Sequence, residues 1–103
     1  NQEHSKALCE AFDANDEMYW QLPLCAFHKR FLSSRRADMT NSGHGDGAPG
    51  ASVAASFLSS FVEKDIPWVH IDLSSAYLPD GSPFLAAGPT GSTILGLSYY
   101  LTK

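Results

Sequence analysis

The residues best suited to chemistry lie in the stretch at 68–77. His70 and Asp72 are two positions apart in a short apolar run, so a strand there would direct both side chains to one face. Both residue types bind metals, but two ligands do not define a site, and a hydrogen-bonded pair is the simpler interpretation. Because α/β enzymes bind ligands just past the carboxyl ends of strands, we expect residues 73–77 to lie closest to a substrate.

A glycine-rich loop, Gly-His-Gly-Asp-Gly-Ala-Pro-Gly, occupies residues 43–50 directly before a helical pattern. Such loops bind phosphate groups at helix N-termini, but the Gly-Lys-Ser/Thr sequence of a P-loop does not follow. A tightly turned connection is the simpler interpretation, and a loop near a ligand is the alternative. The chain has many serines but no Gly-x-Ser-x-Gly sequence, so a Ser–His–Asp hydrolase is not favoured.

Charge and hydropathy disfavour further classes of function. The 103 residues carry 7 Lys and Arg against 11 Asp and Glu, a formal charge of −4, so we expect no nucleic acid partner. No apolar run reaches the ~20 residues that span a bilayer, so we expect no membrane partner. The clustered basic residues are most simply a solvated surface or a subunit contact: Lys29, Arg30, Arg35 and Arg36.

The two cysteines, Cys9 and Cys25, are far apart in the sequence and follow no metal-finger spacing. Reduced, buried thiols in a cytosolic protein are the simpler interpretation. A disulfide stays open, although nothing in the sequence requires one.

Helical periodicity is clear in three segments. Residues 3–12 carry an apolar stripe, and a final helix is expected after the Pro-Thr-Gly-Ser-Thr sequence at 89–93. The clearest helix follows Gly50, and its inward face is expected to hold Ala54, Phe57, Leu58, Phe61 and Val62. The other face of that helix carries Ser52, Ser56, Ser59, Ser60 and Glu63.

The remaining segments are expected to be mostly extended or irregular. Pro23 disfavours helix at the residue before it, so residues 18–24 are expected to be extended. A short helix is then expected, with inward side chains at Leu24, Phe27, His28 and Phe31. Residues 68–73 form a nearly continuous apolar run, which predicts a buried strand, and residues 77–87 predict a Pro/Gly loop.

This set of elements is unbalanced for a complete domain. One or two strands with three or four helices do not make a sheet, because a central strand needs hydrogen-bonding neighbours on both edges. We therefore expect missing strands to come from a longer chain or from a partner. The chain begins with Asn1 rather than Met, and we expect it to be a piece of something longer.

Five sequence stretches follow the order and spacing of a known family. They are Trp-Gln-Leu-Pro-Leu at 20–24, Ala-Asp-Met-Thr-Asn-Ser-Gly at 37–43, the helical stretch at 49–62, Trp-Val-His-Ile-Asp at 68–72 and Ala-Gly-Pro-Thr-Gly at 87–91. From residue 18 onward, the chain resembles the C-terminal part of the catalytic domain of the leucyl aminopeptidase family, which includes cytosol aminopeptidase and peptidase B. Residues 71–77 look more like the peptidase B branch than the animal leucine-preferring branch.

The resemblance implies a fold class and an activity. The fold class is α/β: a C-terminal fragment of a mixed-sheet, three-layer aminopeptidase catalytic domain, in which residues 1–103 are an incomplete domain with helices flanking few strands. The activity is that of a metallo-aminopeptidase that hydrolyses the N-terminal residue from peptides with two divalent cations, zinc or manganese. The resemblance also implies a cytoplasmic homo-hexamer, whose partners are the peptide substrate and the remainder of the catalytic domain.

The family's metal ligands and its catalytic lysine and arginine lie upstream of the matched region. We therefore assign no catalytic and no metal-binding residue in this sequence. No ligand position of the family is matched by Asp38, Asp46 or Asp72.

The resemblance does imply three substrate-binding residues, Ser42, Ser74 and Tyr77. Ser74 and Tyr77 match positions that line the pocket for the N-terminal side chain of the substrate, and Ser42 matches a turn near the next subsite. Ser74 stands where the leucine-preferring branch has a small apolar residue, and Tyr77 replaces a flexible apolar one. We therefore expect a more polar pocket.

Two functions remain open. The first is a segment of a metallo-aminopeptidase that supplies core and part of the substrate pocket and is inactive alone. The alternative is a non-catalytic structural or assembly module derived from that scaffold. Metal-ligand loops upstream would favour the enzyme, and a native start at Asn1 would favour the module.

Overall fold

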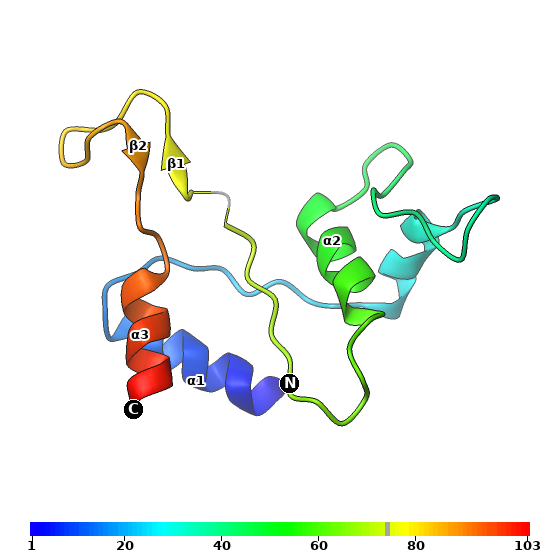
Figure 1. Cartoon of the computed structure of the whole chain (residues 1–103), viewed down its shortest axis with the longest axis horizontal. Helices are drawn as coiled ribbons and strands as arrows, with labels where there is room; N and C mark the ends of the chain where they lie inside the picture. The colour runs from blue at the N-terminus through cyan, green and yellow to red at the C-terminus, as the bar shows by residue number, and fades with distance from the viewer. Residues whose placement is uncertain (74) are drawn as a thin grey trace. The chain divides into compact units, whose positions relative to one another are not determined.

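The computed structural model describes residues 1–73 and 75–103, and the chain divides into two compact units (Figure 1). One unit comprises Asn1–Trp20 and Ile71–Lys103, and the other comprises Gln21–His70. Each unit has its own packed pair of helices. In the described part of the chain, no helix is long and apolar enough to cross a membrane.

Helix α1, Gln2–Asp13, begins where Asn1 caps its first turn. The Asn1 Oδ1 atom accepts hydrogen bonds from the backbone N–H groups of Glu3 at 3.1 Å and His4 at 3.2 Å. These bonds satisfy donors that a helix start leaves open. The buried face of α1 consists of Leu8, Ala11 and Phe12, so the helix predicted at residues 3–12 is confirmed.

Helix α3, Ile94–Thr102, packs against α1, and the predicted final helix is also confirmed. Gly96 is buried at their contact, where a Cβ atom would overlap the Phe12 ring. The Gly96 N–H donates to Glu17 Oε2 at 2.8 Å, so a carboxylate satisfies a first-turn donor and lies favourably at the positive end of the helix dipole. A hydrogen bond between the Tyr100 hydroxyl and His4 Nδ1, 2.6 Å long, also joins the two helices.

Two short strands belong to the same unit. Strand β1, Tyr77–Leu78, pairs antiparallel with β2, Gly88–Pro89, and Tyr77 lies opposite Pro89. The connection between them turns at Gly81, whose φ of +71° suits glycine and whose nearest neighbours are backbone atoms. The Pro/Gly loop predicted at 77–87 is thus a hairpin connection that begins with a short strand.

The strand predicted at residues 68–73 is wrong. These residues have neither helical nor strand structure, and β1–β2 is the only ladder among the residues described. An apolar run becomes a strand only where a neighbouring strand takes up its backbone hydrogen bonds, and no strand in the described chain pairs with this segment. His70 and Asp72 therefore have no shared strand face, and they fall in different units.

In the unit Gln21–His70, the 3₁₀-helix η1, Ala26–Leu32, packs against helix α2, Gly50–Ser59. The buried core consists of Phe31, Leu32 and Val53. Three partly buried side chains pack against this core: Met39, Ala48 and Phe57. The short helix predicted after residue 24 is confirmed, with 3₁₀ rather than α geometry.

The side chains of η1 do not all face the predicted way. His28 and Phe31 are buried as predicted, whereas Leu24 and Phe27 are about half exposed. A 3₁₀-helix has three residues per turn, so Phe27 shares a face with Arg30 rather than with the buried pair. The Arg30 guanidinium lies over the rings of Phe27 and Phe31, at 5.3 and 4.7 Å from their centres.

Helix α2 buries a different face from the predicted one. Ser52, Val53 and Ser56 are buried, whereas Leu58 and Phe61 are 44% and 69% exposed. Small serine side chains let α2 approach η1 closely, so Ser52 and Ser56 pack inward. Of the predicted inward face, Phe57 packs against the core, whereas Ala54 and Leu58 are exposed. The helix ends at Ser59, before the last two apolar positions of the predicted face.

The thiols and the basic cluster lie near the surface. Cys9 and Cys25 are both free and half-buried, so reduced thiols are confirmed but full burial is not. The four clustered basic residues are exposed, as expected for a solvated surface.

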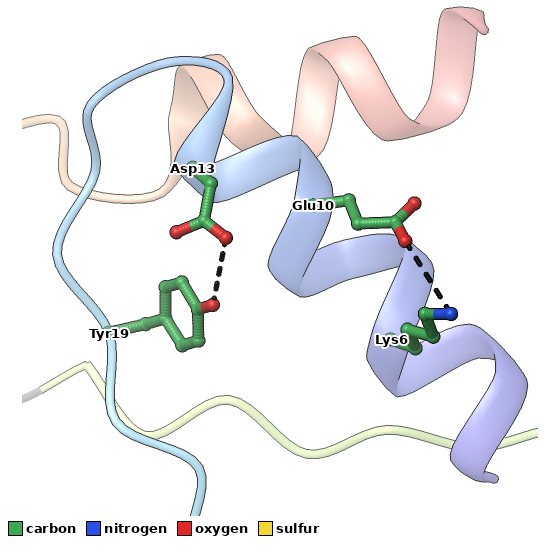
Figure 2. Close-up of polar contacts among 4 residues, drawn as sticks. All are labelled: Lys6, Glu10, Asp13 and Tyr19. Carbon is green, nitrogen blue, oxygen red and sulfur yellow. Dashed lines mark hydrogen bonds and ion pairs between the residues drawn. The ribbon is translucent and has the colours of Figure 1, made fainter.

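A hydrogen bond at the end of α1 changes the acidity of a tyrosine (Figure 2). The Tyr19 hydroxyl donates to Asp13 Oδ2 at 3.1 Å. This bond, with burial and the Asp13 charge adding to it, raises the pKa of Tyr19 from 10.0 to about 12. On the same helix Lys6 and Glu10 are 4.0 Å apart and both exposed, so this ion pair stabilises the helix little.

Replacing Gly96 with alanine should destabilise the packing of α1 on α3, because the new Cβ overlaps Phe12 and lies 2.7 Å from Glu17 Oε2. Overpacking of this kind costs about 1–3 kcal/mol, and the better helix propensity of alanine returns at most ~1 kcal/mol. We expect a net loss of about 1–2 kcal/mol in the free energy of unfolding. Urea unfolding followed by circular dichroism measures it.

The matched control for this substitution is Gly50→Ala. Gly50 is the first residue of α2, and a Cβ there meets no atom within 4 Å. Its unfolding midpoint should be unchanged or slightly higher. Equal midpoints for the Gly96 and Gly50 variants would contradict the close contact at Gly96.

The Tyr19 phenol should titrate well above an ordinary tyrosine. Its ionisation removes the hydrogen bond and places a second negative charge beside Asp13, so the folded-state pKa of about 12 exceeds the unfolded value of 10.0. The stabilisation is therefore complete below pH 10.0 and is lost as the pH rises through about 12. By ¹³C NMR, the Tyr19 phenol should titrate near 12, and Asp13→Ala should shift its pKa toward 10.0. A Tyr19 phenol that titrates near 10.0 in the unchanged protein would refute the bond.

Candidate substrate-binding site

Tyr77, the predicted pocket residue, is the first residue of β1, and its side chain is 63% exposed. Its backbone position is set by the pairing with Pro89 in β2. An exposed aromatic side chain on a hydrogen-bonded hairpin combines a fixed backbone with a ring and hydroxyl that are open to a ligand. Tyr77 can therefore offer a ligand both apolar contact and a hydrogen bond.

Thr90, just after β2, joins two segments of this hairpin. Its backbone N–H donates to the Ala76 carbonyl at 2.9 Å, and its hydroxyl donates to the Ser75 carbonyl at 2.8 Å. The Thr90 hydroxyl oxygen also accepts from the Ser92 N–H at 3.2 Å, and the Ser75 and Ser92 hydroxyls lie 3.3 Å apart. Residues 75–76 are thereby tied to residues 90–92 immediately before Tyr77.

Ser42, the predicted residue of the next subsite, lies in the other unit and is exposed. It belongs to the turn Asn-Ser-Gly at 41–43, where the Thr40 hydroxyl donates to the Ser42 carbonyl at 3.2 Å. Gly43 is needed there, because a Cβ would come within 2.6 Å of Val53 Cγ1 in the core. The turn is thus anchored directly on the buried core of its unit.

Backbone hydrogen bonds hold this turn from both sides. The Thr40 N–H donates to the Leu32 carbonyl at 2.9 Å, and the His44 N–H donates to the Phe31 carbonyl at 3.1 Å. Both acceptors belong to η1, so the 3₁₀-helix fixes the residues on either side of Ser42.

An open depression of about 550 Å³ lies beside this turn. Phe57 and Phe61 line it from α2 and the residues after it, and residues 37–41 with Ser34 line it from the loop. Asp38 is the only charged residue in this lining, and Asn41 is next to Ser42 in the sequence. Aromatic rings facing a polar loop can take an apolar group beside a hydrogen-bonded one.

The three predicted substrate-binding residues are not brought together by the described structure. Ser42 belongs to the unit Gln21–His70, and Tyr77 belongs to the other unit. Ser74 lies outside the described residues. Their joint role in one substrate cleft therefore stays a prediction.

The glycine-rich loop at 43–50 is held in place by its own contacts. The His44 side chain donates from Nε2 to the Ser33 carbonyl at 2.7 Å, and Gly45 and Gly47 adopt positive φ angles of 104° and 74°. No side chain caps the start of α2. These features favour the turned connection, and a role for the loop near a ligand stays a prediction.

The potential metal ligands of this chain are described over residues 1–73 and 75–103. No group of three or more His, Cys, Asp or Glu side chains in those ranges could hold a metal ion. The aspartates that matched no ligand position are all exposed: Asp38, Asp46 and Asp72. A two-metal centre needs several carboxylates around shared cations, so the residues present here do not fit one. No step of metal chemistry is derived from this chain.

Comparison with known proteins shows the family to which this chain belongs. Residues 1–97 match the family model described as the cytosol aminopeptidase family, catalytic domain. The chain therefore belongs to the cytosol aminopeptidase family, which confirms the family indicated by the five sequence stretches.

Individual members of this family also match the chain along most or all of its length. Peptidase B of Vibrio parahaemolyticus is 42% identical over 94 residues, which cover 90% of this chain and 22% of that protein. The probable cytosol aminopeptidase of Treponema denticola is 35% identical over 105 residues, which cover 100% of this chain and 22% of that protein. This chain thus spans about a fifth of the length of the curated relatives that it matches.

A solved structure matches as well. The crystal structure of the cytosol aminopeptidase from Coxiella burnetii has a TM-score of 0.87 and 33% identity, over 99% of this chain and 22% of that chain. Helices with a small two-stranded sheet, in a fold similar to part of a cytosol aminopeptidase, agree with the predicted α/β class.

Thr90 is the residue of this region to which the sequence alone assigned no role. It lies in the Ala-Gly-Pro-Thr-Gly stretch at 87–91, which contributed to the resemblance. Its two acceptors are about fifteen residues earlier in the chain, and such a contact depends on the hairpin rather than on local spacing. The available signal was only that Thr90 carries a hydroxyl group, a side chain that often bonds to backbone groups.

Proposed function

We propose that this chain is the C-terminal segment of the catalytic domain of a metallo-aminopeptidase that hydrolyses the N-terminal residue from peptides. The observation that carries the proposal is the match of residues 1–97 to the catalytic domain of the cytosol aminopeptidase family. The chain corresponds to 22% of the similar solved structure, so the remainder of the domain would supply the metal ligands and the catalytic lysine and arginine.

In this proposal the segment completes a mixed-sheet, three-layer domain. Exposed apolar side chains support it: Trp20 is 87% exposed, and Leu58 and Phe61 lie on the outward face of α2 and just beyond it. Burying side chains of this size contributes about 1.5–3 kcal/mol each. The remainder of the catalytic domain is the partner proposed to cover them, because this chain matches only 22% of the length of each of these relatives.

The segment also contributes to the substrate pocket. Tyr77, with Ser74, is proposed to line the pocket for the N-terminal side chain of the peptide, and Ser42 to lie near the next subsite. The exposure of Tyr77 and Ser42 on anchored backbone supports this role, because both side chains are open to a ligand. A phenol hydroxyl in that pocket favours N-terminal residues more polar than leucine.

The whole enzyme is proposed to be a cytoplasmic homo-hexamer with two divalent cations, zinc or manganese. Membership of the cytosol aminopeptidase family supports these properties. The cations would polarise the scissile carbonyl and activate water when bound.

The full-length protein that contains this chain should hydrolyse leucine p-nitroanilide in the presence of Mn²⁺ or Zn²⁺. The 103-residue chain alone should be inactive under the same conditions, because its described residues provide no metal-binding group. A spectrophotometric assay of both proteins at equal molar concentration makes the comparison. Hydrolysis by the 103-residue chain would contradict the proposal, and an inactive, metal-loaded full-length protein would favour the non-catalytic module.

Replacing Tyr77 with methionine in the full-length enzyme should shift its preference toward leucine. Loss of the hydroxyl removes a hydrogen bond to polar side chains, so the ratio of kcat/KM for Glu and Asp substrates over Leu substrates should fall by about threefold to tenfold. Tyr99→Met is the matched control, because Tyr99 is a partly exposed tyrosine on α3 and its ratio should not change. Unchanged preferences in the Tyr77 variant would refute the polar pocket.

A further inference from the structure

We infer that Thr90 is a positioning residue, which sets the pocket for the N-terminal side chain of the substrate by fixing the segment that carries Tyr77. The inference rests on the proposed function, because it takes Tyr77 to line that pocket. Thr90 is not proposed to touch substrate; it acts through the backbone of residues 75–77.

Thr90 holds two consecutive carbonyl groups. Its hydroxyl donates to the Ser75 carbonyl at 2.8 Å and its N–H donates to the Ala76 carbonyl at 2.9 Å, both ordinary hydrogen-bond lengths. Two bonds to neighbouring carbonyls fix both the place and the orientation of a chain segment. The next residue along is Tyr77, so these bonds set the direction from which its side chain starts.

Few other backbone hydrogen bonds in the hairpin fix the position of Tyr77. Strands β1 and β2 are two residues long, and the partner of Tyr77 is Pro89. In this register Ala76 lies opposite Thr90, so the bond from the Thr90 N–H to the Ala76 carbonyl is the ladder bond beside the Tyr77–Pro89 pair, whose own backbone groups do not bond to each other. The Thr90 hydroxyl adds a side-chain bond to Ser75 at the point where this short ladder begins.

The surroundings of the Thr90 side chain favour a role in holding the neighbouring backbone rather than in packing the apolar core. Thr90 is half-buried and lies outside the apolar core of its unit. Its hydroxyl donates to Ser75 and accepts from the Ser92 N–H at 3.2 Å, so both its donor and an acceptor site are in use. Valine has the same shape without the hydroxyl and removes both bonds while leaving the backbone bond to Ala76.

The test uses the full-length enzyme with Thr90→Val, Thr90→Ser and the matched control Thr102→Val. Thr102 also donates its hydroxyl to a backbone carbonyl at 2.8 Å, but that carbonyl belongs to Ser98 within α3. The readout is kcat and KM for alanine, leucine and glutamate p-nitroanilides, expressed as ratios between substrates. Ratios are independent of how much of the enzyme is folded, which separates positioning from simple loss of structure.

Thr90→Val should change the ratio of kcat/KM for leucine or glutamate over alanine by about twofold to tenfold, the range expected for one lost hydrogen bond. The change should lie mainly in KM, because a displaced pocket weakens binding of the side chain. Thr90→Ser and Thr102→Val should keep the wild-type ratios. In a Tyr77→Met background, Thr90→Val should have no further effect on the ratios.

Several results would overturn the inference. A uniform fall for all three substrates in Thr90→Val, or an equal change in Thr102→Val, would assign Thr90 a general structural role. An effect that persists in the Tyr77→Met background would mean that it does not act through Tyr77. If Thr90→Val yields no soluble enzyme, Thr90→Ala removes the same hydroxyl bond to Ser75 and should shift the ratios by about twofold to tenfold; unchanged ratios would reject the inference. A wild-type enzyme that is inactive on every substrate would instead reject the proposed function.

Discussion

Hydrophobic burial is the interaction on which this structure depends, and this chain by itself forms only two small hydrophobic cores. In the described residues, six apolar side chains are buried: Leu8, Ala11 and Phe12 in one unit, and Phe31, Leu32 and Val53 in the other. Among the same described residues, seventeen large apolar side chains are exposed, and three of them are exposed almost fully: Met18, Trp20 and Phe84. A soluble chain rarely leaves so much apolar surface open unless a partner covers it. The remainder of a catalytic domain is the partner that membership of the cytosol aminopeptidase family supports.

Because both cores are small, the packing depends on small residues that let neighbouring segments lie close together, rather than on many large apolar side chains. Gly96 lets α3 lie against Phe12, and Gly43 lets the turn beside Ser42 lie against Val53. The serine face of α2 serves the same purpose against η1. The Gly43 contact places Ser42 beside a packed core, and Tyr77 lies on a hydrogen-bonded hairpin. Thr90 extends this support to Tyr77 through its ladder bond to Ala76 and its hydroxyl bond to Ser75.

The sequence predicted the positions of the helices, which depend on local pattern. It did not predict which faces are buried or which segments pair as strands, because these depend on distant parts of the fold. The periodicity at 3–12 and the apolar residues after 93 located α1 and α3 correctly. The pattern also located α2, but it assigned Leu58 and Phe61 to a core within the chain, whereas both are exposed. The apolar run at 68–73 predicted a strand, yet pairing needs a second strand that the described chain does not provide. Thr90 was missed because its acceptors come from a distant part of the hairpin, and the motifs that revealed the family carry no such geometry.

The central claim is that the rest of a catalytic domain covers the apolar side chains that this chain leaves exposed. Hydroxyl-radical footprinting with mass spectrometry tests it directly, by comparing the oxidation of Met18, Trp20 and Phe84 in the 103-residue chain and in the full-length protein. Lys6 and Glu10, which are exposed on α1 and form only a weak ion pair, provide internal references for general reactivity. The account predicts that the three apolar side chains are oxidised several-fold more slowly in the full-length protein. Equal oxidation rates in the two proteins would contradict it.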